Sequence, residues 1–324
     1  MEIYFAPMEG LTGYVVRNAY LHHLNCFDKY FTPFLSYAEN MNFKQLRDVA
    51  PENNQGLRLV VQVMSNRSAE VIHQARQQAA LGHTELNINL GCPSGTVASK
   101  GRGSGFLQDP QGIDRFLGEL YAFRAGGEIP GFELSVKTRV GYHDTDHWEE
   151  LLQVYRRHPQ MGELIIHPRI QSDAYKGAIR PETFDRAVEV LSDSGITLVY
   201  NGDLFDSESY EQIHERWPSV DHFMLGRGAF MYPGLALKLK GIALPEDEYR
   251  RRMQAMMDEI LQEFLLIFDG PAPVISHLKE HWLYLRCSFK DSDYYWKKIK
   301  KCRDLDNYRL LTERFFRELE LEEF

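Results

Sequence analysis

No stretch of this 324-residue chain approaches the ~18 uncharged apolar residues that a membrane-spanning helix requires. The first residues, MEIYFAPMEG, have neither the basic start nor the apolar core of a signal peptide, and they predict a strand. We therefore expect a cytoplasmic protein with no membrane partner.

Cysteine is scarce, with four residues that form no CxxC pair and no His/Cys cluster at metal-ligand spacing. We therefore expect no disulfide framework and no metal site. Any cysteine chemistry would be that of a single thiol. For Cys26, Cys287 and Cys302 we expect the ordinary role of a small apolar side chain.

Basic residues are outnumbered, 37 against 46 acidic ones, and the net charge of −9 argues mildly against a nucleic-acid partner. One segment departs from this balance. Residues 296–303 carry five cations and no acid, directly after the aromatic pair Tyr294-Tyr295. On a helix these cations would offer a local contact for phosphates, although charge alone equally allows a solvated helix face.

Short apolar runs alternate with helix-period segments, the pattern of βα units around a parallel sheet. The predicted strands are residues 3–8, 29–35, 57–64, 85–90, 132–140, 163–167, 197–201 and 222–225. The clearest predicted helices are residues 69–82, 113–126, 148–159, 181–195 and 207–218. Eight repeats in about 240 residues predict an α/β protein with a (β/α)8 TIM barrel.

After Gly241 the strand signals stop, and helices are predicted over residues 246–267, 273–288, 292–302 and 307–319. The sequence therefore predicts a barrel catalytic domain over 1–244. A small all-α helical-bundle domain follows over 245–324.

Polar residues gather at the predicted strand ends, where the loops of a TIM barrel carry its chemistry. After strands seven and eight stand YNGD and LGRGAF. Their glycines would let the backbone approach a phosphate, and Arg227 could add a charged contact. The alternative is that both loops are tight turns of an ordinary barrel.

Four further side chains at strand ends suit a flavin enzyme. Lys137 could stabilise the flavin edge that becomes anionic on reduction, and Gln62 and His167 could bond its polar groups. Cys92 follows a strand and opens a loop rich in Gly and Ser, where a thiol can act as general acid or nucleophile.

Six motifs occur in order along the barrel: APMEGLTG, NINLGCP, KTRVGY, HPR, YNGD and GRGAF. Together they resemble the tRNA-dihydrouridine synthases, across the whole barrel. The helical tail resembles the family only in size and position. One departure is HPRI, where many members read HGRT.

The resemblance implies an FMN site and a catalytic cysteine at Cys92, with Asn89 facing the uracil. The residues implied for FMN are Pro7, Met8, Glu9, Gln62, Lys137, His167, Asn201, Gly202, Asp203, Gly226 and Arg227. The candidate tRNA contacts are Lys100, Arg102, Arg139, Arg169, Tyr175, Lys176, Lys297, Lys298, Lys300 and Lys301.

The implied reaction is reduction of a uridine C5–C6 double bond in tRNA by a monomeric enzyme, with NADPH or NADH as electron donor and Cys92 as general acid. A base in a distorted or single-stranded loop costs least to extrude into such a site. Two alternatives stay open: a flavin barrel oxidoreductase acting on a free pyrimidine or other small molecule, and a non-catalytic RNA-binding barrel protein.

Overall fold

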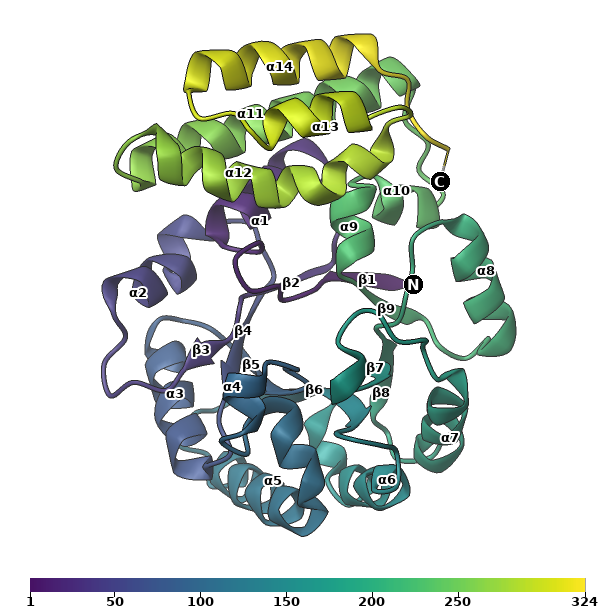
Figure 1. Ribbon diagram of the computed structural model, residues 1–324. Helices are drawn as coiled ribbons and strands as arrows, with labels where there is room; N and C mark the ends of the chain where they lie inside the picture. Colours follow the sequence, from purple (N-terminus) through teal and green to yellow (C-terminus); the bar gives the residue numbers. More distant parts are fainter. Residues whose placement is uncertain (324) are drawn as a thin grey trace.

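The computed structural model, which describes residues 1–323, contains a closed barrel of eight parallel strands (Figure 1). The ring closes where the first strand pairs with the last, Ile3 opposite Phe223. Its strands are β1 (Glu2–Phe5), β2 (Lys29–Phe31), β4 (Leu59–Met64), β5 (Glu85–Leu90), β6 (Glu133–Gly141), β7 (Glu163–Ile170), β8 (Thr197–Tyr200) and β9 (His222–Leu225). The predicted TIM-barrel class is confirmed.

The first two predicted strands end well before the expected residue. The first ends at Phe5, before Pro7, and not at residue 8. The second was expected over residues 29–35, but it ends at Phe31, and a two-residue strand β3 (Leu35–Ser36) then pairs with β4. Pro33 lies in the gap, and its missing N–H cannot continue a hydrogen-bonded ladder.

Helices surround the barrel and bury their apolar faces against the outer side of the strands (Figure 1). Helix α6, for example, buries Leu151, Leu152 and Tyr155 and exposes Glu149. The helices are α1 (Tyr14–His23), α2 (Phe43–Val49), α3 (Ser68–Ala80), α4 (Gly95–Ala98), α5 (Pro110–Ala125), α6 (Trp148–Arg156), α7 (Pro181–Leu191), α8 (Ser207–Arg216), α9 (Arg227–Met231) and α10 (Leu235–Leu239). The five predicted helices all form, at α3, α5, α6, α7 and α8.

The interior of the barrel is divided between an apolar and a polar part. Strand β5 reads ELNINL, so successive side chains alternate between the outer helices and the barrel interior. Its three inward side chains, Glu85, Asn87 and Asn89, are all polar. Elsewhere the interior is filled by Tyr4, Ala6, Phe31, Val60, Ile165, Val199 and Met224. A TIM barrel is ordinarily filled by bulky aliphatic layers, so the polar inner face of β5 is unusual.

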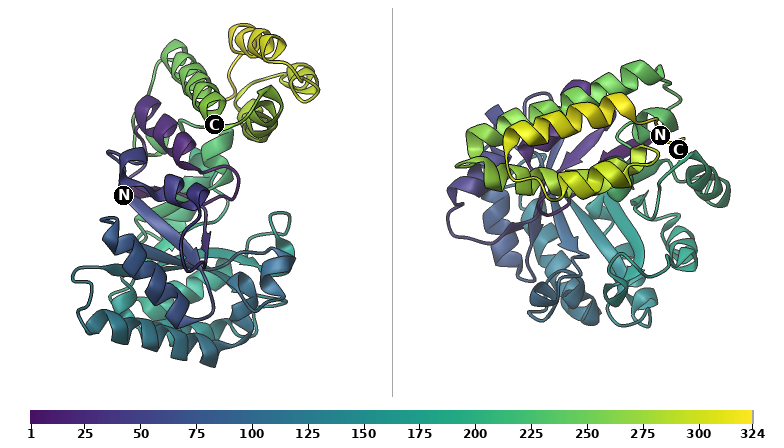
Figure 2. Two further views of the ribbon diagram at one scale, coloured as in Figure 1. Left: turned by 90° about the vertical axis from the view of Figure 1, so that its left-hand side faces the viewer. Right: turned by 45° about the horizontal axis from the view of Figure 1, so that its top comes forward.

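Four helices follow the barrel: α11 (Glu246–Ile267), α12 (Pro271–Leu285), α13 (Asp293–Ile299) and α14 (Leu305–Glu318). They lie together on one side of the barrel, beside α1 and α9 (Figures 1 and 2). Their own core includes Trp282, whose Nε1 donates to the hydroxyl of Tyr308 at 2.7 Å, and Phe315. No helix within residues 1–323 is long and apolar enough to cross a membrane.

Candidate active site

A pocket opens at the carboxyl side of the barrel, between strands β6 and β7 and the loops that follow β1, β7, β8 and β9. Ten residues expected from the sequence line it: Pro7, Met8, Lys137, His167, Tyr175, Asn201, Gly202, Asp203, Gly226 and Arg227. Four lining residues were not among the candidates: Ala6, Leu204, Phe205 and Gly228. Ala6 and Gly228 stand within the motifs APMEGLTG and GRGAF, and Leu204 and Phe205 directly follow Asp203, so the motifs and their neighbours were the signal.

Lys137 is a cation without a partner in this pocket. No described residue makes a hydrogen bond or an ion pair with its ammonium group. Burial and the nearby Arg139 guanidinium lower the pKa of Lys137 to about 7, an effect that Cys92 partly opposes. Desolvating a cation in this way is costly unless an anionic group pairs with it. The position therefore suits a ligand with a negative or electron-rich edge.

Asp203 lies between two arginines at the phosphate-type loops. Arg169 donates to both of its carboxylate oxygens, at 2.8 and 2.6 Å, and Arg227 donates to Oδ1 at 2.5 Å. Burial works against ionisation of Asp203, but the hydrogen bonds and charges of the two arginines lower its pKa below the usual range. Asp203 is thus an ionised anchor that orients Arg227 at the pocket wall.

His167 is buried in the same wall, and its Nε2 lies 3.2 Å from a guanidinium nitrogen of Arg169. Burial and the surrounding cations, Arg139 first among them, lower the pKa of His167 well below its usual value. The ring is therefore neutral at physiological pH. Tyr175 stacks on it with 6.3 Å between ring centroids and contacts the Arg227 guanidinium at 5.3 Å, while half of Tyr175 stays exposed.

Cys92 follows β5, the strand next to the one that bears Lys137, and its loop is held at several points. The backbone N–H groups of Gly91 and Cys92 donate to Oδ1 of Asn89, at 2.9 and 2.8 Å. The Ser104 hydroxyl donates to the Cys92 carbonyl at 2.7 Å. Burial raises the pKa of the Cys92 thiol, opposed by the Ser94 backbone and Arg139. The thiol is therefore protonated at neutral pH.

Three of the expected site residues are engaged below the pocket surface. Gln62 does not line the pocket, because its amide is bound to Asn87 and Asn89 inside the barrel. Arg139 donates to the carbonyls of Gly91, Ile170 and Ala174, all within 2.9 Å. Arg169 also donates to the Gly177 carbonyl at 2.7 Å. These arginines shape the loops and leave few donors free for a ligand.

The remaining candidates lie on the surface, and none of them lines the pocket. Glu9 is exposed, and its charge contributes to the raised pKa of Cys92. Arg102 pairs with Glu70 at 3.3 Å. Lys298 contacts the ring and hydroxyl of Tyr294. The lysines that are exposed are Lys100, Lys176, Lys297, Lys298, Lys300 and Lys301.

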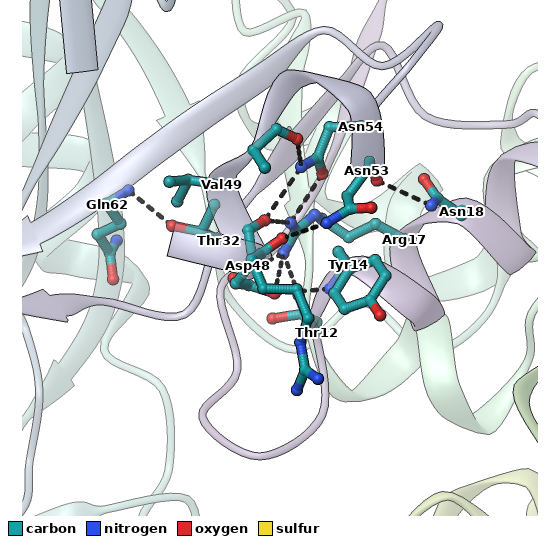
Figure 3. A network of polar contacts seen from close by, with 12 residues as sticks. Thr12, Tyr14, Arg17, Asn18, Thr32, Asp48, Val49, Asn53, Asn54 and Gln62 are labelled. Carbon is teal, nitrogen blue, oxygen red and sulfur yellow. Dashed lines mark hydrogen bonds and ion pairs between the residues drawn. The ribbon is translucent and has the colours of Figure 1, made fainter. Parts of the chain in front are cut away.

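A network of polar contacts around the buried Arg17 (Figure 3) holds Thr12, which in turn fixes the loop that carries Pro7 and Met8. The Met8 N–H donates to the Thr12 hydroxyl at 2.8 Å, and Arg17, which is fully buried, donates to the Thr12 carbonyl at 2.6 Å. Arg17 also donates to the Asp48 carbonyl and to Asn54, at 2.6 and 2.8 Å. One wall of the pocket is thereby tied to the segment between α2 and β4.

The fold and pocket define a TIM-barrel enzyme whose site lies at the strand ends. Among solved structures, morphinone reductase is similar in fold, with a TM-score of 0.54 at 11% identity over 76% of this chain and 88% of that one. A morphinone reductase structure in complex with tetrahydroNAD gives a TM-score of 0.51 at 12% identity, over 76% of this chain and 90% of that one.

Sequence comparison identifies the family. The profile of the family described as dihydrouridine synthase (Dus) matches residues 4–317, and the chain belongs to this family. A probable tRNA-dihydrouridine synthase of Staphylococcus aureus (strain COL) is 30% identical over 237 residues, 70% of this chain and 68% of that protein. The probable tRNA-dihydrouridine synthase 2 of Bacillus subtilis (strain 168) is 30% identical over 235 residues, 70% of this chain and 69% of that protein. The predicted class, a flavin-dependent oxidoreductase, is confirmed.

Proposed function

We propose that this protein is an FMN-dependent enzyme that reduces a uridine of tRNA to 5,6-dihydrouridine. The observation that carries the proposal is the Lys137 ammonium group, which has no partner among residues 1–323, in a pocket next to the strand that is followed by a protonated thiol, Cys92. A reduction of a C=C bond needs both a hydride source and an acid. Lys137 would bind the flavin that supplies the hydride, and Cys92 would supply the proton. The names of the family and of its relatives support the substrate.

The residues of the pocket fit FMN. Lys137 would meet the electron-rich edge of the ring system, and the neutral His167 ring could donate or accept a hydrogen bond beside it. Arg227, oriented by Asp203, would bind the phosphate together with the loops at Asn201-Gly202 and Gly226. We place Pro7 and Met8 against the ring, because both line the pocket on a fixed loop.

When bound, FMN supplies the hydride for the uracil ring, with NADPH or NADH as the electron donor. Cys92 supplies the proton to C5. Its raised pKa keeps the thiol protonated, and the hydrogen bonds from Gly91 and Cys92 to Asn89 hold the thiol's backbone in place. The remaining Nδ2 hydrogen of Asn89 is available to the uracil edge, because that amide nitrogen has one bond inside the protein.

We propose that residues 245–324 form the tRNA-binding domain, with exposed lysines at the end of α13 and directly after it as phosphate contacts: Lys297, Lys298, Lys300 and Lys301. Lys100, Lys176 and the half-exposed Tyr175 would contact the RNA near the pocket. Arg139 and Arg169 would act indirectly, by holding the loops that carry these residues, since their own donors are engaged. A cytoplasmic location and a monomeric state stay predictions.

The test combines chromophore analysis with substrate choice. Acid release from the purified protein, followed by chromatography, should yield FMN, and finding FAD or no flavin after reconstitution would overturn the cofactor. NADPH oxidation should then depend on unmodified tRNA, and nucleoside analysis should detect dihydrouridine. Turnover of free uracil or uridine without tRNA would instead support the small-molecule oxidoreductase. Flavin-free RNA binding would support the non-catalytic barrel.

A further inference from the structure

The polar inner face of β5 forms one continuous chain of hydrogen bonds that runs down the inside of the barrel from the Cys92 loop. Asn89 donates to Gln62 at 2.7 Å, and Gln62 donates to Asn87 at 2.8 Å. Asn87 donates to the Ser135 hydroxyl at 3.0 Å, and this hydroxyl donates to Oε1 of Glu85 at 2.9 Å. The chain therefore connects a carboxylate near the start of β5 to the loop after its end.

Lys29 anchors the lower end of this chain between two carboxylates. Its ammonium group lies 3.0 Å from Oε2 of Glu85 and 2.7 Å from Oε1 of Glu163, and only 2% of the Lys29 side chain is exposed. Oε1 of Glu163 also accepts from the Tyr4 hydroxyl at 2.9 Å, whereas its Oε2 is buried and has no hydrogen-bond partner within residues 1–323. Glu85 is the only one of the two carboxylates that belongs to the chain leading to Asn89.

The chain can point in only one direction, because both of its ends are fixed in character. At the upper end, two backbone N–H groups can only donate, so Asn89 must present its oxygen to them and its NH₂ group to Gln62. Gln62 and Asn87 must then repeat this orientation. At the lower end, the Ser135 proton needs an acceptor, and the carboxylate paired with Lys29 supplies it.

We propose that Glu85 and Ser135 are positioning residues for Cys92, acting through this one-directional chain. The proposal rests on the proposed function, in which Cys92 is the acid. Buried amides are satisfied only when every donor faces an acceptor. If the orientation of the hydrogen bond between Ser135 and Glu85 is reversed, a donor or acceptor is left unsatisfied wherever the chain of hydrogen bonds is interrupted. Loss of the Asn89 orientation would release the N–H groups of Gly91 and Cys92, and the thiol would lose its fixed place.

Two substitutions of equal charge and size separate this role from general stability. In Glu85→Gln the new amide can turn its NH₂ group toward the Lys29 ammonium, which sets a donor against a donor. If it turns toward Ser135 instead, that hydroxyl loses its acceptor at 2.9 Å and must donate to the Leu86 carbonyl at 3.5 Å. In Glu163→Gln the NH₂ group can occupy the position of Oε2, which has no partner, while Oε1 keeps Lys29 and Tyr4. Lys29 keeps one carboxylate in both variants.

The experiment measures alkylation of Cys92 by iodoacetamide in the full-length purified protein, followed by peptide mass spectrometry. Cys287, partly exposed in the helical region, reports in the same reaction as an internal control. Glu85→Gln should raise the alkylation rate of Cys92 by roughly two- to tenfold, the worth of about one hydrogen bond, with Cys287 unchanged. Glu163→Gln should leave both rates at their native values. In single-turnover reduction of tRNA, Glu85→Gln should lower the rate constant without changing the tRNA concentration at half-maximal rate.

Equal effects of the two substitutions on Cys92, or no effect of either, would overturn the proposal. Should Glu85→Gln fail to fold, Ser135→Ala decides the question, because it cuts the same chain without changing a charge. Faster alkylation of Cys92 in Ser135→Ala supports the chain, and an unchanged rate refutes it. The alkylation measurement uses neither tRNA nor NADPH. Its result therefore does not depend on whether the proposed activity is correct.

Discussion

Lys137→Met should make the flavin-free protein more stable at neutral pH while weakening flavin binding. The lysine is desolvated and has no partner among the residues that the structure describes, so the charge of Lys137 destabilises the folded protein until a ligand binds. Methionine fills a similar volume without a charge. The substitution therefore separates what the site needs from what the fold needs.

The size and pH dependence follow from the pKa of Lys137, which is about 7 in the folded protein against an ordinary 10.5. Between these values the unfolded chain holds a proton that the folded chain has released, so the native protein gains stability as pH rises. One unit corresponds to ~1.4 kcal/mol, so at pH 7 the methionine variant should gain up to about 4 kcal/mol. This advantage should shrink steadily as pH rises from 7 toward 10.5.

Urea unfolding of the flavin-free proteins at pH 6.5, 8 and 9.5 measures the gain, and flavin fluorescence titration measures the binding. Lys176→Met, at an exposed position beside the pocket, is the matched control and should change neither quantity much. A methionine variant that is less stable than the native protein at every pH, or whose gain does not depend on pH, would refute the assignment of Lys137 as a desolvated cation. Unchanged flavin affinity would remove Lys137 from the cofactor site.

Three further outcomes are expected. Cys92→Ala should leave flavin content and flavin reduction by NADPH intact but slow uracil reduction by roughly two to four orders of magnitude, as stopped-flow separation of the half-reactions would show. Burial and His277 lower the pKa of His281 to about 4, so the stability of the native chain relative to His281→Leu should fall as pH drops from 6.5 to 4, by up to ~1.4 kcal/mol per unit in urea unfolding. Neutralising four exposed lysines should weaken tRNA binding and flatten its salt dependence, at unchanged flavin content, in fluorescence titrations. These lysines are Lys297, Lys298, Lys300 and Lys301.

The sequence predicts the barrel well because each strand is encoded by a short-range pattern of residues. Strand β5 has the predicted bounds, Glu85–Leu90, since its alternation and its flanking turns are local signals. Strand β7 was expected to end at residue 167 but runs to Ile170, despite Pro168. There Ile170 pairs with Gly141 across an irregularity in β6. Such a pairing between distant segments produces no local pattern in the sequence of either segment.

The candidate site was predictable where it consists of loops at strand ends, and not where side chains from different loops meet. Ten pocket residues were found because a TIM barrel places its chemistry there. The link from Arg169 to Asp203 spans 34 positions, and nothing in either motif reveals that they bind each other. Gln62 was expected at the cofactor, but it follows the register of Asn87, which draws its amide into the barrel interior.

The helices after the barrel also bear on how the chain assembles. Helix α11 packs along α1, where Glu259 binds His22 and His23 at 2.8 Å each, and α12 packs on α9. Helices α1 and α9 follow β1 and β9, the two strands that close the ring. During synthesis from the N-terminus, α1 therefore has no partner for this face until more than 220 further residues have been made. A helix made long after α1 therefore completes the cover of α1, and this face stays open until α11 has docked.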